Sequence, residues 1–98
     1  MNGATPLRGA CFFGHVDVVR ELLYRGANLK AANNFGATPL THASSRGDVE
    51  VVRALLAAGA DKHHVDGDGK TAASCAGTNH HAPPDSRAAI LALLAAAP

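Results

Sequence analysis

The sequence is poor in aromatic residues: it has no tryptophan, and aromatic residues make up only 4% of its 98 residues. A core in a domain of this size must therefore be filled by small aliphatic side chains, and the abundant alanine suits closely packed helices. The sequence also lacks an excess of charge of either sign, since its formal net charge is +1. This balance offers no electrostatic footprint for nucleic acid or for an anionic membrane.

Cysteine and long apolar runs are scarce as well. Two cysteines, Cys11 and Cys75, do not build a disulfide framework, which favours a reducing compartment. The longest apolar run, residues 88–97, is about half of the roughly 20 residues that a membrane-spanning helix needs. No secretion signal is evident, because Met1 leads directly into a repeated motif. We therefore expect a soluble intracellular protein, in the cytoplasm or the nucleus.

The sequence does contain an internal repeat. The motif Gly-Ala-Thr-Pro-Leu occurs at residues 3–7 and again at residues 36–40, and a degraded copy stands at residues 69–73. The glycines that open these copies are 33 residues apart. Such a period is typical of a small structural unit stacked on copies of itself. We predict a single domain over residues 1–98, divided into units at about residues 1–32, 33–65 and 66–98.

Each unit is predicted to contain two short helices. Thr5 and Thr38 suit the N-cap position, and the proline after each of them suits the first helical position. The first helix then ends at about Phe13 or Arg46, where a glycine can take the left-handed conformation. The second helix begins about two residues later and carries apolar residues at helical spacing. The links between units are polar and bounded by glycine, which predicts extended turns.

The third unit departs from the 33-residue spacing. If the Leu-Leu pair at residues 93–94 corresponds to the pair at residues 55–56, the offset is 38 residues, so the unit contains an insertion. The excess lies in residues 78–85, where two prolines rule out a helix. We therefore expect an extended loop between the two helices of this unit. Ser86 is predicted to cap the last helix, residues 87–97.

The repeated unit resembles the ankyrin repeat. That family places Gly-x-Thr-Pro-Leu before the first helix and Leu-Leu-x-x-Gly-Ala-Asp or -Asn after the second, and residues 36–40 and 55–61 match this pattern. The resemblance covers essentially the whole chain. It implies an all-α solenoid of stacked helix-turn-helix units joined by extended, hairpin-like turns. It specifies the fold more closely than the function, because the family binds many unrelated partners.

The chain departs from the family pattern at three places. Arg8, Thr41 and Ser74 stand where the family usually has a histidine, so we expect a weaker hydrogen-bond network and a modest loss of stability. Ala72 and Ala73 replace Pro-Leu in the third unit, which predicts a less firmly anchored helix. The last helix lacks the polar outer face that terminal units need, which favours an excerpt from a longer array. Alternatively, a partner or another copy covers an end, or alanine is tolerated there.

No catalytic constellation is evident in the sequence. The serine, histidine and acidic residues lack triad or nucleophile-elbow spacing, and residues 61–68 lack the ligand spacing of a calcium loop. The histidine pairs at residues 63–64 and 80–81 raise the alternative of a zinc or nickel site with Cys75 nearby. However, a helix of about 12 Å separates the two pairs. We interpret the histidines as solvated loop residues and expect no enzymatic activity and no cofactor.

Two further expectations concern single residues. Both cysteines are predicted to be buried, inert thiols. His63 follows Leu55 by eight residues and Asp61 by two, a spacing that resembles the hydroxylation site of many ankyrin repeats. This leaves a modification of His63 as an open alternative.

The resemblance also implies a binding surface. In the ankyrin family, partners bind a concave face that consists of the turn tips and the exposed side of each first helix. Mapped by position, this face comprises Asn2, Ala4, Phe12, Phe13, Asn34, Phe35, Ala37, Ser45, Arg46, Asp68, Lys70, Thr78 and Asn79. Exposed phenylalanine and arginine are frequent interface anchors, and Phe35 at a turn tip is the best single candidate. Alternatively, Phe12 or Phe13 packs on the neighbouring unit, since adjacent helical residues cannot share a face.

The sequence thus predicts a protein–protein interaction module that binds a partner protein through its concave face. Two alternatives remain open at this point. The array could be the targeting or regulatory segment of a larger enzyme or signalling protein. It could also be a structural module that associates with itself through the apolar last helix.

Overall fold

The computed structural model describes residues 6–29, 36–79 and 82–96. Within these ranges the chain forms six helices and no strand. The helices are α1 (Pro6–Phe13), α2 (Val16–Tyr24), α3 (Pro39–Arg46), α4 (Val49–Ala57), α5 (Ala72–Cys75) and α6 (Ser86–Ala96). The predicted all-α class is confirmed, and each unit contributes two consecutive helices. None of the described helices is both long and apolar enough to cross a membrane.

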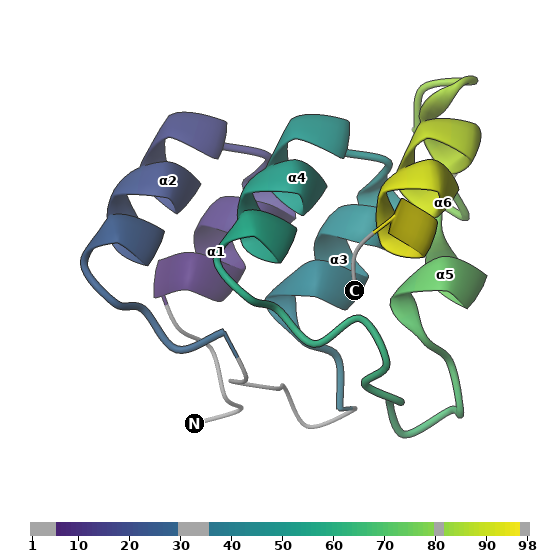
Figure 1. Cartoon of the computed structure of the whole chain (residues 1–98), viewed down its shortest axis with the longest axis horizontal. Helices are drawn as coiled ribbons and strands as arrows, with labels where there is room; N and C mark the ends of the chain where they lie inside the picture. Colours follow the sequence, from purple (N-terminus) through teal and green to yellow (C-terminus); the bar gives the residue numbers. More distant parts are fainter. Residues whose placement is uncertain (1–5, 30–35, 80–81, 97–98) are drawn as a thin grey trace.

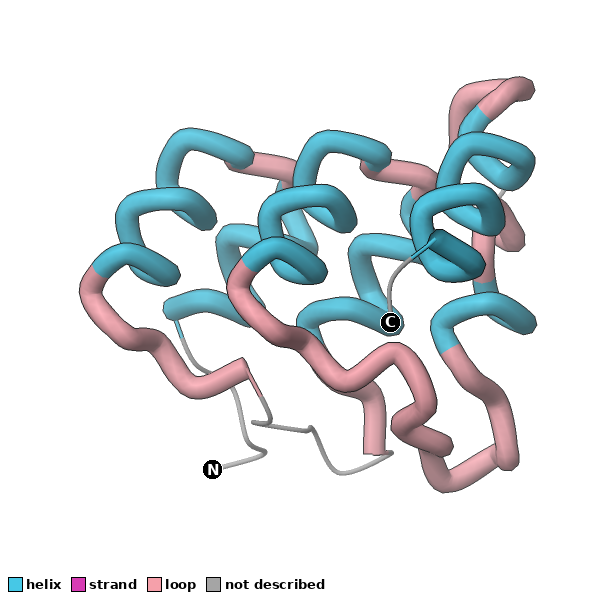
Figure 2. The backbone as a smooth tube through the Cα atoms, viewed as in Figure 1, coloured by secondary structure: helices cyan, strands magenta, loops and turns pink. Residues whose placement is uncertain are grey.

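The helices are arranged in two layers. The second helices α2, α4 and α6 stand side by side in one layer, and the first helices α1, α3 and α5 form the other (Figure 1). Along each layer, every helix contacts its counterpart in the next unit. The segments that join one unit to the next all leave the helices on the same side (Figure 2). The three units are therefore stacked in one direction, as a solenoid requires.

A threonine starts the first helix of the second unit, as predicted. Thr38 is the N-cap of α3: its hydroxyl accepts from the Thr41 N–H (3.4 Å), while Thr41 Oγ1 accepts from the Thr38 N–H (2.8 Å). Thr71 and Ser74 form the same reciprocal pair at α5. Thus hydroxyls at the family's histidine position satisfy the local backbone groups. The lower stability expected from that replacement stays a prediction, and Thr5 lies outside the described residues.

The third unit is irregular, as the sequence predicts. Helix α5 has four residues, whereas α1 and α3 have eight each. The inserted loop packs against the turn after α3, where a Cβ on Gly47 would lie 2.8 Å from the Ala82 Cβ. The predicted cap of the last helix is wrong. Ser86 is the first residue of α6, and its buried hydroxyl donates to the Pro83 carbonyl (2.7 Å) instead of capping the helix.

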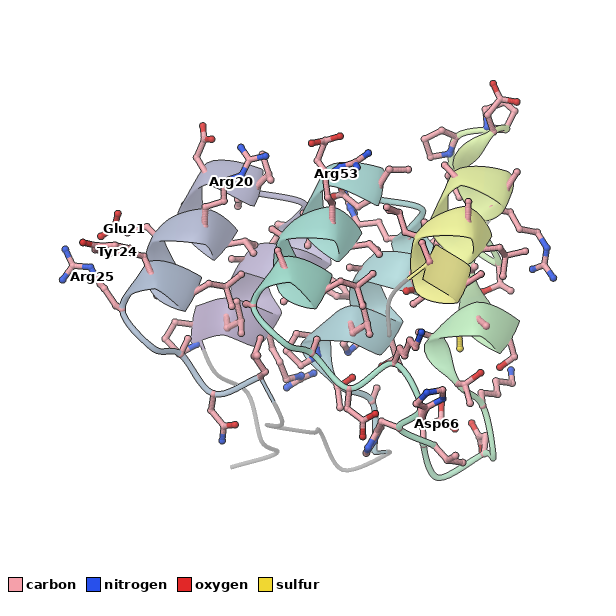
Figure 3. The ribbon with its side chains drawn as sticks, viewed as in Figure 1. Arg20, Glu21, Tyr24, Arg25, Arg53 and Asp66 are labelled. Carbon is pink, nitrogen blue, oxygen red and sulfur yellow. The ribbon has the colours of Figure 1, made fainter. Side chains whose placement is uncertain are left out.

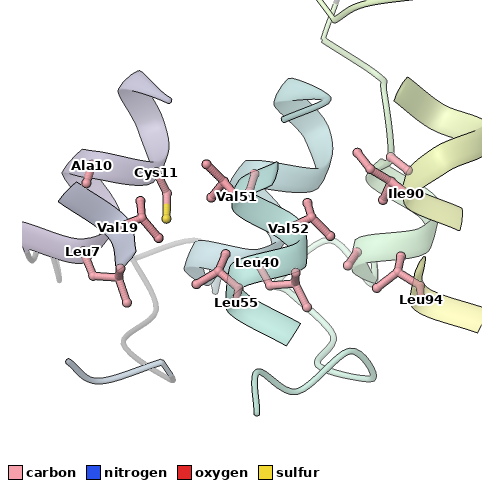
Figure 4. Packing of buried hydrophobic residues seen from close by; sticks show 13 residues of the cluster. Leu7, Ala10, Cys11, Val19, Leu40, Val51, Val52, Leu55, Ile90 and Leu94 are labelled. Atoms are coloured by element: carbon pink, nitrogen blue, oxygen red, sulfur yellow. The ribbon is translucent and has the colours of Figure 1, made fainter. Parts of the chain in front are cut away.

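Small aliphatic side chains fill the core, as the scarcity of aromatic residues predicts. Leucine, valine and isoleucine from all three units meet between the two layers (Figure 4). Val51 is fully buried because α2 lies against α4, whereas its counterpart Val18 is 49% exposed. Thus the middle unit is covered on both sides by described elements, and the first unit on one side only.

Both thiols are buried, as predicted. Burial raises the pKa of Cys11 to about 12, with a smaller contribution from the carboxylate of Asp48. The pKa of Cys75 is also raised, first by burial and then by Asp66. Because the thiolate is the reactive form, a raised pKa makes both side chains inert near neutral pH.

Candidate functional site

An exposed aromatic pair stands at the C-terminal end of α1. Phe12 and Phe13 are 56% and 63% exposed, and their rings meet edge to face with centroids 5.1 Å apart. Phe12 also meets the ring of His42 on α3 edge to face, at 6.1 Å, and Phe13 stacks on His15 at the same distance. Phe12 therefore contacts the neighbouring unit, as one alternative predicted, yet both rings remain open to solvent.

His42 on α3 contacts a second residue of α1 besides Phe12. Arg8 Nη2 lies 3.3 Å from His42 Nε2. Since a guanidinium can only donate, Nε2 is the acceptor and the ring proton of the neutral imidazole resides on Nδ1. Burial, and then the charge of Arg8, lower the pKa of His42, so this ring is neutral at pH 7. The site thus offers a neutral imidazole beside an exposed phenylalanine.

Arg46 holds the aromatic pair in place. Its Nη1 donates to the Phe12 carbonyl (3.1 Å) and its Nη2 to the Phe13 carbonyl (3.4 Å), while its Nε lies 3.6 Å from Asp48 Oδ2. These carbonyls belong to the last turn of α1, where backbone acceptors lack partners within the helix. The guanidinium therefore caps α1 from the next unit. Direct contact between Arg46 and a partner stays a prediction.

The third unit caps the C-terminal end of α3 in a similar way. The Ser44 carbonyl accepts from the Gly77 N–H (2.9 Å), and the Ser45 carbonyl accepts from the Asn79 N–H (3.0 Å). Ser45 Oγ also lies 3.2 Å from Thr78 Oγ1. Backbone donors at Gly77 and at Asn79 of the inserted loop thus bond to carbonyls in the last turn of α3, and Ser45 is engaged within the protein.

Two adjacent depressions lie at these helix ends. One, of about 100 Å³, is lined by Phe12, His42, Ser45, Arg46 and Asn79. The other, of about 440 Å³, is lined by Arg46, Gly47, Asp48, Asn79 and Pro83. Arg46 and Asn79 line both depressions and stand between them. The structure brings together six members of the predicted set here, which we call the helix-end surface: Phe12, Phe13, Ser45, Arg46, Thr78 and Asn79.

The turn tip before the third unit is well ordered by hydrogen bonds. Asp66 Oδ1 accepts from the backbone N–H groups of Asp68 (2.8 Å) and Lys70 (2.9 Å), and the Asp66 N–H donates to the Lys70 carbonyl (2.9 Å). The bond from Lys70, above all, holds the pKa of Asp66 below its ordinary value. Asp66 lies below the helices, in the link to the third unit (Figure 3). Asp68 and Lys70 are exposed at this tip.

The predicted set therefore divides between two places. Ala37, Asp68 and Lys70 lie where the first helices begin, and the helix-end surface lies where they end. An eight-residue helix puts about 12 Å between the two places. The remaining predicted residues, Asn2, Ala4, Asn34 and Phe35, lie outside the described residues.

His64 has a structural role that sequence reasoning missed. Its Nε2 donates to the Gly36 carbonyl at 2.7 Å, and its side chain is half-buried, so the interpretation as a solvated loop residue is wrong for His64. His63 is exposed, as expected. The spacing within a unit gave no signal for this contact, because its acceptor, the Gly36 carbonyl, belongs to a different link. The Gly36 backbone also packs closely: a Cβ there would lie 2.9 Å from the Gly67 nitrogen.

No metal centre is formed by the residues that the structure places: nowhere among them do three or more His, Cys, Asp or Glu side chains gather to hold an ion. His80 and His81 lie outside those residues.

The comparison with known families agrees with the stacked architecture. A family model described as ankyrin repeats, in three copies, matches residues 7–95. No curated protein matches the chain.

Proposed function

Because this chain belongs to the ankyrin repeat family, we propose that it is a non-enzymatic module that binds a partner protein through its helix-end surface. Ankyrin repeats are generally protein–protein interaction modules. The observation that carries the proposal is the exposed pair of Phe12 and Phe13, whose backbone carbonyls are held by Arg46.

The physical properties of this pair suit an interface anchor. Aromatic rings supply a large contact area for the few torsions that binding must fix. Here the edge-to-face contact and the capped backbone fix part of that geometry in the free protein, which lowers the entropy cost of association. The adjoining depressions add polar groups at their rims, as protein interfaces require.

The proposal extends to the turn tips. Ala37, Asp68 and Lys70 lie where the first helices begin, so a partner that touches both ends would cover the first-helix layer. Asn34 and Phe35 are included in the proposal by their positions in the sequence alone. The net charge of +1 favours a protein over nucleic acid as this partner. We also propose an intracellular location, because the two buried cysteines are free thiols.

Affinity capture with the double variant Phe12→Ala/Phe13→Ala tests the proposal. We expect it to lose proteins that the wild type retains, with an affinity reduced by about 30-fold, as for hot-spot residues. Tyr24→Ala is the matched control, because Tyr24 is an 89% exposed aromatic residue at the outer edge of α2 (Figure 3). Arg46 is unsuitable for this test, since its removal would also uncap α1. Binding that survives the double variant and is lost in Tyr24→Ala would contradict the proposal.

A further inference from the structure

The ring of Phe12 contacts the second unit at His42. The two rings meet edge to face, with centroids 6.1 Å apart and an angle of 83° between their planes. His42 is half-buried, and it lines the smaller depression of the helix-end surface together with Phe12 and Arg46. A change in the position of the His42 ring would therefore alter one wall of this depression and one contact of the exposed phenylalanine.

The contact between Arg8 and His42 suits only one protonation state of the imidazole. Arg8 Nη2 lies 3.3 Å from His42 Nε2, and a guanidinium has N–H donors and no acceptor. Nε2 must therefore present a lone pair. In an imidazolium both ring nitrogens carry hydrogen, so two donors and two positive charges would face each other at this distance. Proton binding thus replaces an attraction by a repulsion.

The charged groups on the same helix and on α4 do not offset this repulsion. Arg46, one turn further along α3, is a second cation at the depression, and the carboxylate of Asp48 lies 3.6 Å from its Nε. The titratable side chains of α4 are Glu50 and Arg53, whose charged groups lie 3.7 Å apart. Neither of them acts on the pKa of His42, whose causes are burial and then the charge of Arg8.

The third unit brings no acidic group to this place. The only titratable side chain of α5 is Cys75, which is a neutral thiol because its pKa is raised. Asn79, which follows α5, lines the same depression and is uncharged. The residues outside the described ranges include no aspartate or glutamate. The surroundings of His42 therefore accept a neutral ring and oppose a charged one.

We propose that His42 makes the helix-end surface sensitive to pH: when its ring binds a proton, Phe12 loses its contact with the second unit and partner binding weakens. This inference rests on the function proposed above, because it concerns the regulation of the same surface. The physical cause is the repulsion from Arg8, which drives the charged ring away from its place beside Phe12.

The direction of the effect follows from the linkage between protons and binding. The neutral ring predominates above the ordinary histidine pKa of 6.5, and the imidazolium forms as the pH falls through the lower pKa of the folded protein. A partner that covers the depression would bury His42 further and favour the neutral ring. Binding would therefore release a proton from the charged form, and affinity would fall as the pH falls.

The free chain gives the first test, by NMR between about pH 8 and about pH 5. The ring protons of His42 should titrate with a midpoint below 6.5, and the nuclear Overhauser effect between the rings of Phe12 and His42 should weaken with the same midpoint. Arg8→Gln should move this midpoint to higher pH, because it removes the cation. His15→Gln is the matched control: His15 stacks on Phe13, so the Phe12–His42 signal should keep its pH dependence.

Partner binding gives the second test, with His42→Gln as the variant. A glutamine can still accept from Arg8 but does not titrate in this range. The probe is a protein that the wild type captures and Phe12→Ala/Phe13→Ala does not. Its affinity for the wild type should fall by about threefold or more from pH 7.5 to pH 5, relative to its affinity for His42→Gln at the same pH. This ratio cancels titration of the partner's own groups.

The outcomes separate this inference from the proposed function. A Phe12–His42 signal that does not change with pH, or a His42 midpoint at or above 6.5, would overturn the pH sensitivity and leave Phe12 and Phe13 as anchors. Equal pH dependence of binding in the wild type and His42→Gln would also overturn it. If Phe12→Ala/Phe13→Ala retains every protein that the wild type captures, the proposed function fails, and the NMR titration still decides whether a proton on His42 releases Phe12.

Discussion

At the scale of one residue, the buried hydroxyl of Ser44 affects the stability of the protein. Ser44 on α3 is fully buried, and its Oγ has no hydrogen-bond partner among the residues that the structure describes. Its counterpart in the first unit is Cys11, which is equally buried but far less polar. A buried polar atom without a partner costs folding free energy, because it loses its hydrogen bonds to water.

Ser44→Ala should therefore stabilise the protein. We expect the free energy of unfolding to rise by about 1 kcal/mol, measured by urea denaturation. Ser45→Ala is the neighbouring control: its hydroxyl lies against Thr78, so its removal should give no gain. A lower urea midpoint for Ser44→Ala than for the wild type would contradict the prediction.

The sequence predicts the burial and the role of a residue where its surroundings come from its own unit. Buried, inert cysteines followed from their place in the repeat pattern. The roles of Arg46 and His64 did not, because their partners belong to other units or links: the carbonyls of α1 for Arg46 and the Gly36 carbonyl for His64. Spacing within one unit contains no information about which backbone acceptor of a neighbour lies within reach.

Among the structural elements, the turn tip around Asp66 makes the stability of the protein depend on pH. The folded state lowers the pKa of Asp66, chiefly through the Lys70 N–H and less through the Asp68 N–H. A lowered pKa means that the charged carboxylate stabilises the folded state. This contribution is complete above the ordinary pKa of about 4 and is lost as the pH falls through the lower pKa of the folded protein.

Asp66→Asn should therefore flatten the pH dependence of stability. We expect the difference in unfolding midpoint between the wild type and this variant to shrink as the pH falls from about 5 to about 2. Asp66→Ala should lose the same pH dependence and should also be less stable than Asp66→Asn at pH 7, because it lacks an acceptor for the turn. If the unfolding midpoints of the wild type and Asp66→Asn change in parallel with pH, Asp66 does not cause the pH dependence of stability.

The helices show how far capping signals predict the bounds of an element. The glycines after α1 and α3 mark where these helices end, and Thr38 with Pro39 marks where α3 begins. The start of α6 was missed by one residue, because contacts with the inserted loop decide it. The buried Ser86 packs near Gly47 of the neighbouring unit, a contact that local propensity does not reveal.

For the molecule as a whole, stability should differ between the units. Helix α3 has neighbours on both sides, whereas α5 is half its length and has Ala73 in place of the buried leucine. In a stacked array, each unit depends on its own helices and on its interfaces with adjacent units. We therefore expect α5 to open more readily than α3.

Native-state hydrogen exchange can measure this difference. The amides of α5 should exchange faster than the amides at corresponding positions of α3, because local opening of α5 exposes less apolar surface. Ala73→Leu should slow exchange in α5 and leave α1 unchanged. Equal protection of α3 and α5 in the wild type would show that the units unfold as one cooperative body.

The close packing of Gly36 has a consequence for saturation mutagenesis of this protein. Any side chain at Gly36 would displace the backbone at Asp66 and Gly67, and with it the tip that presents Asp68 and Lys70. A scan that selects for partner binding would then score position 36 as an interface residue, although a partner need never touch it. Separate selections for abundance and for binding would be needed to distinguish positions that make contact from positions that leave room for their neighbours.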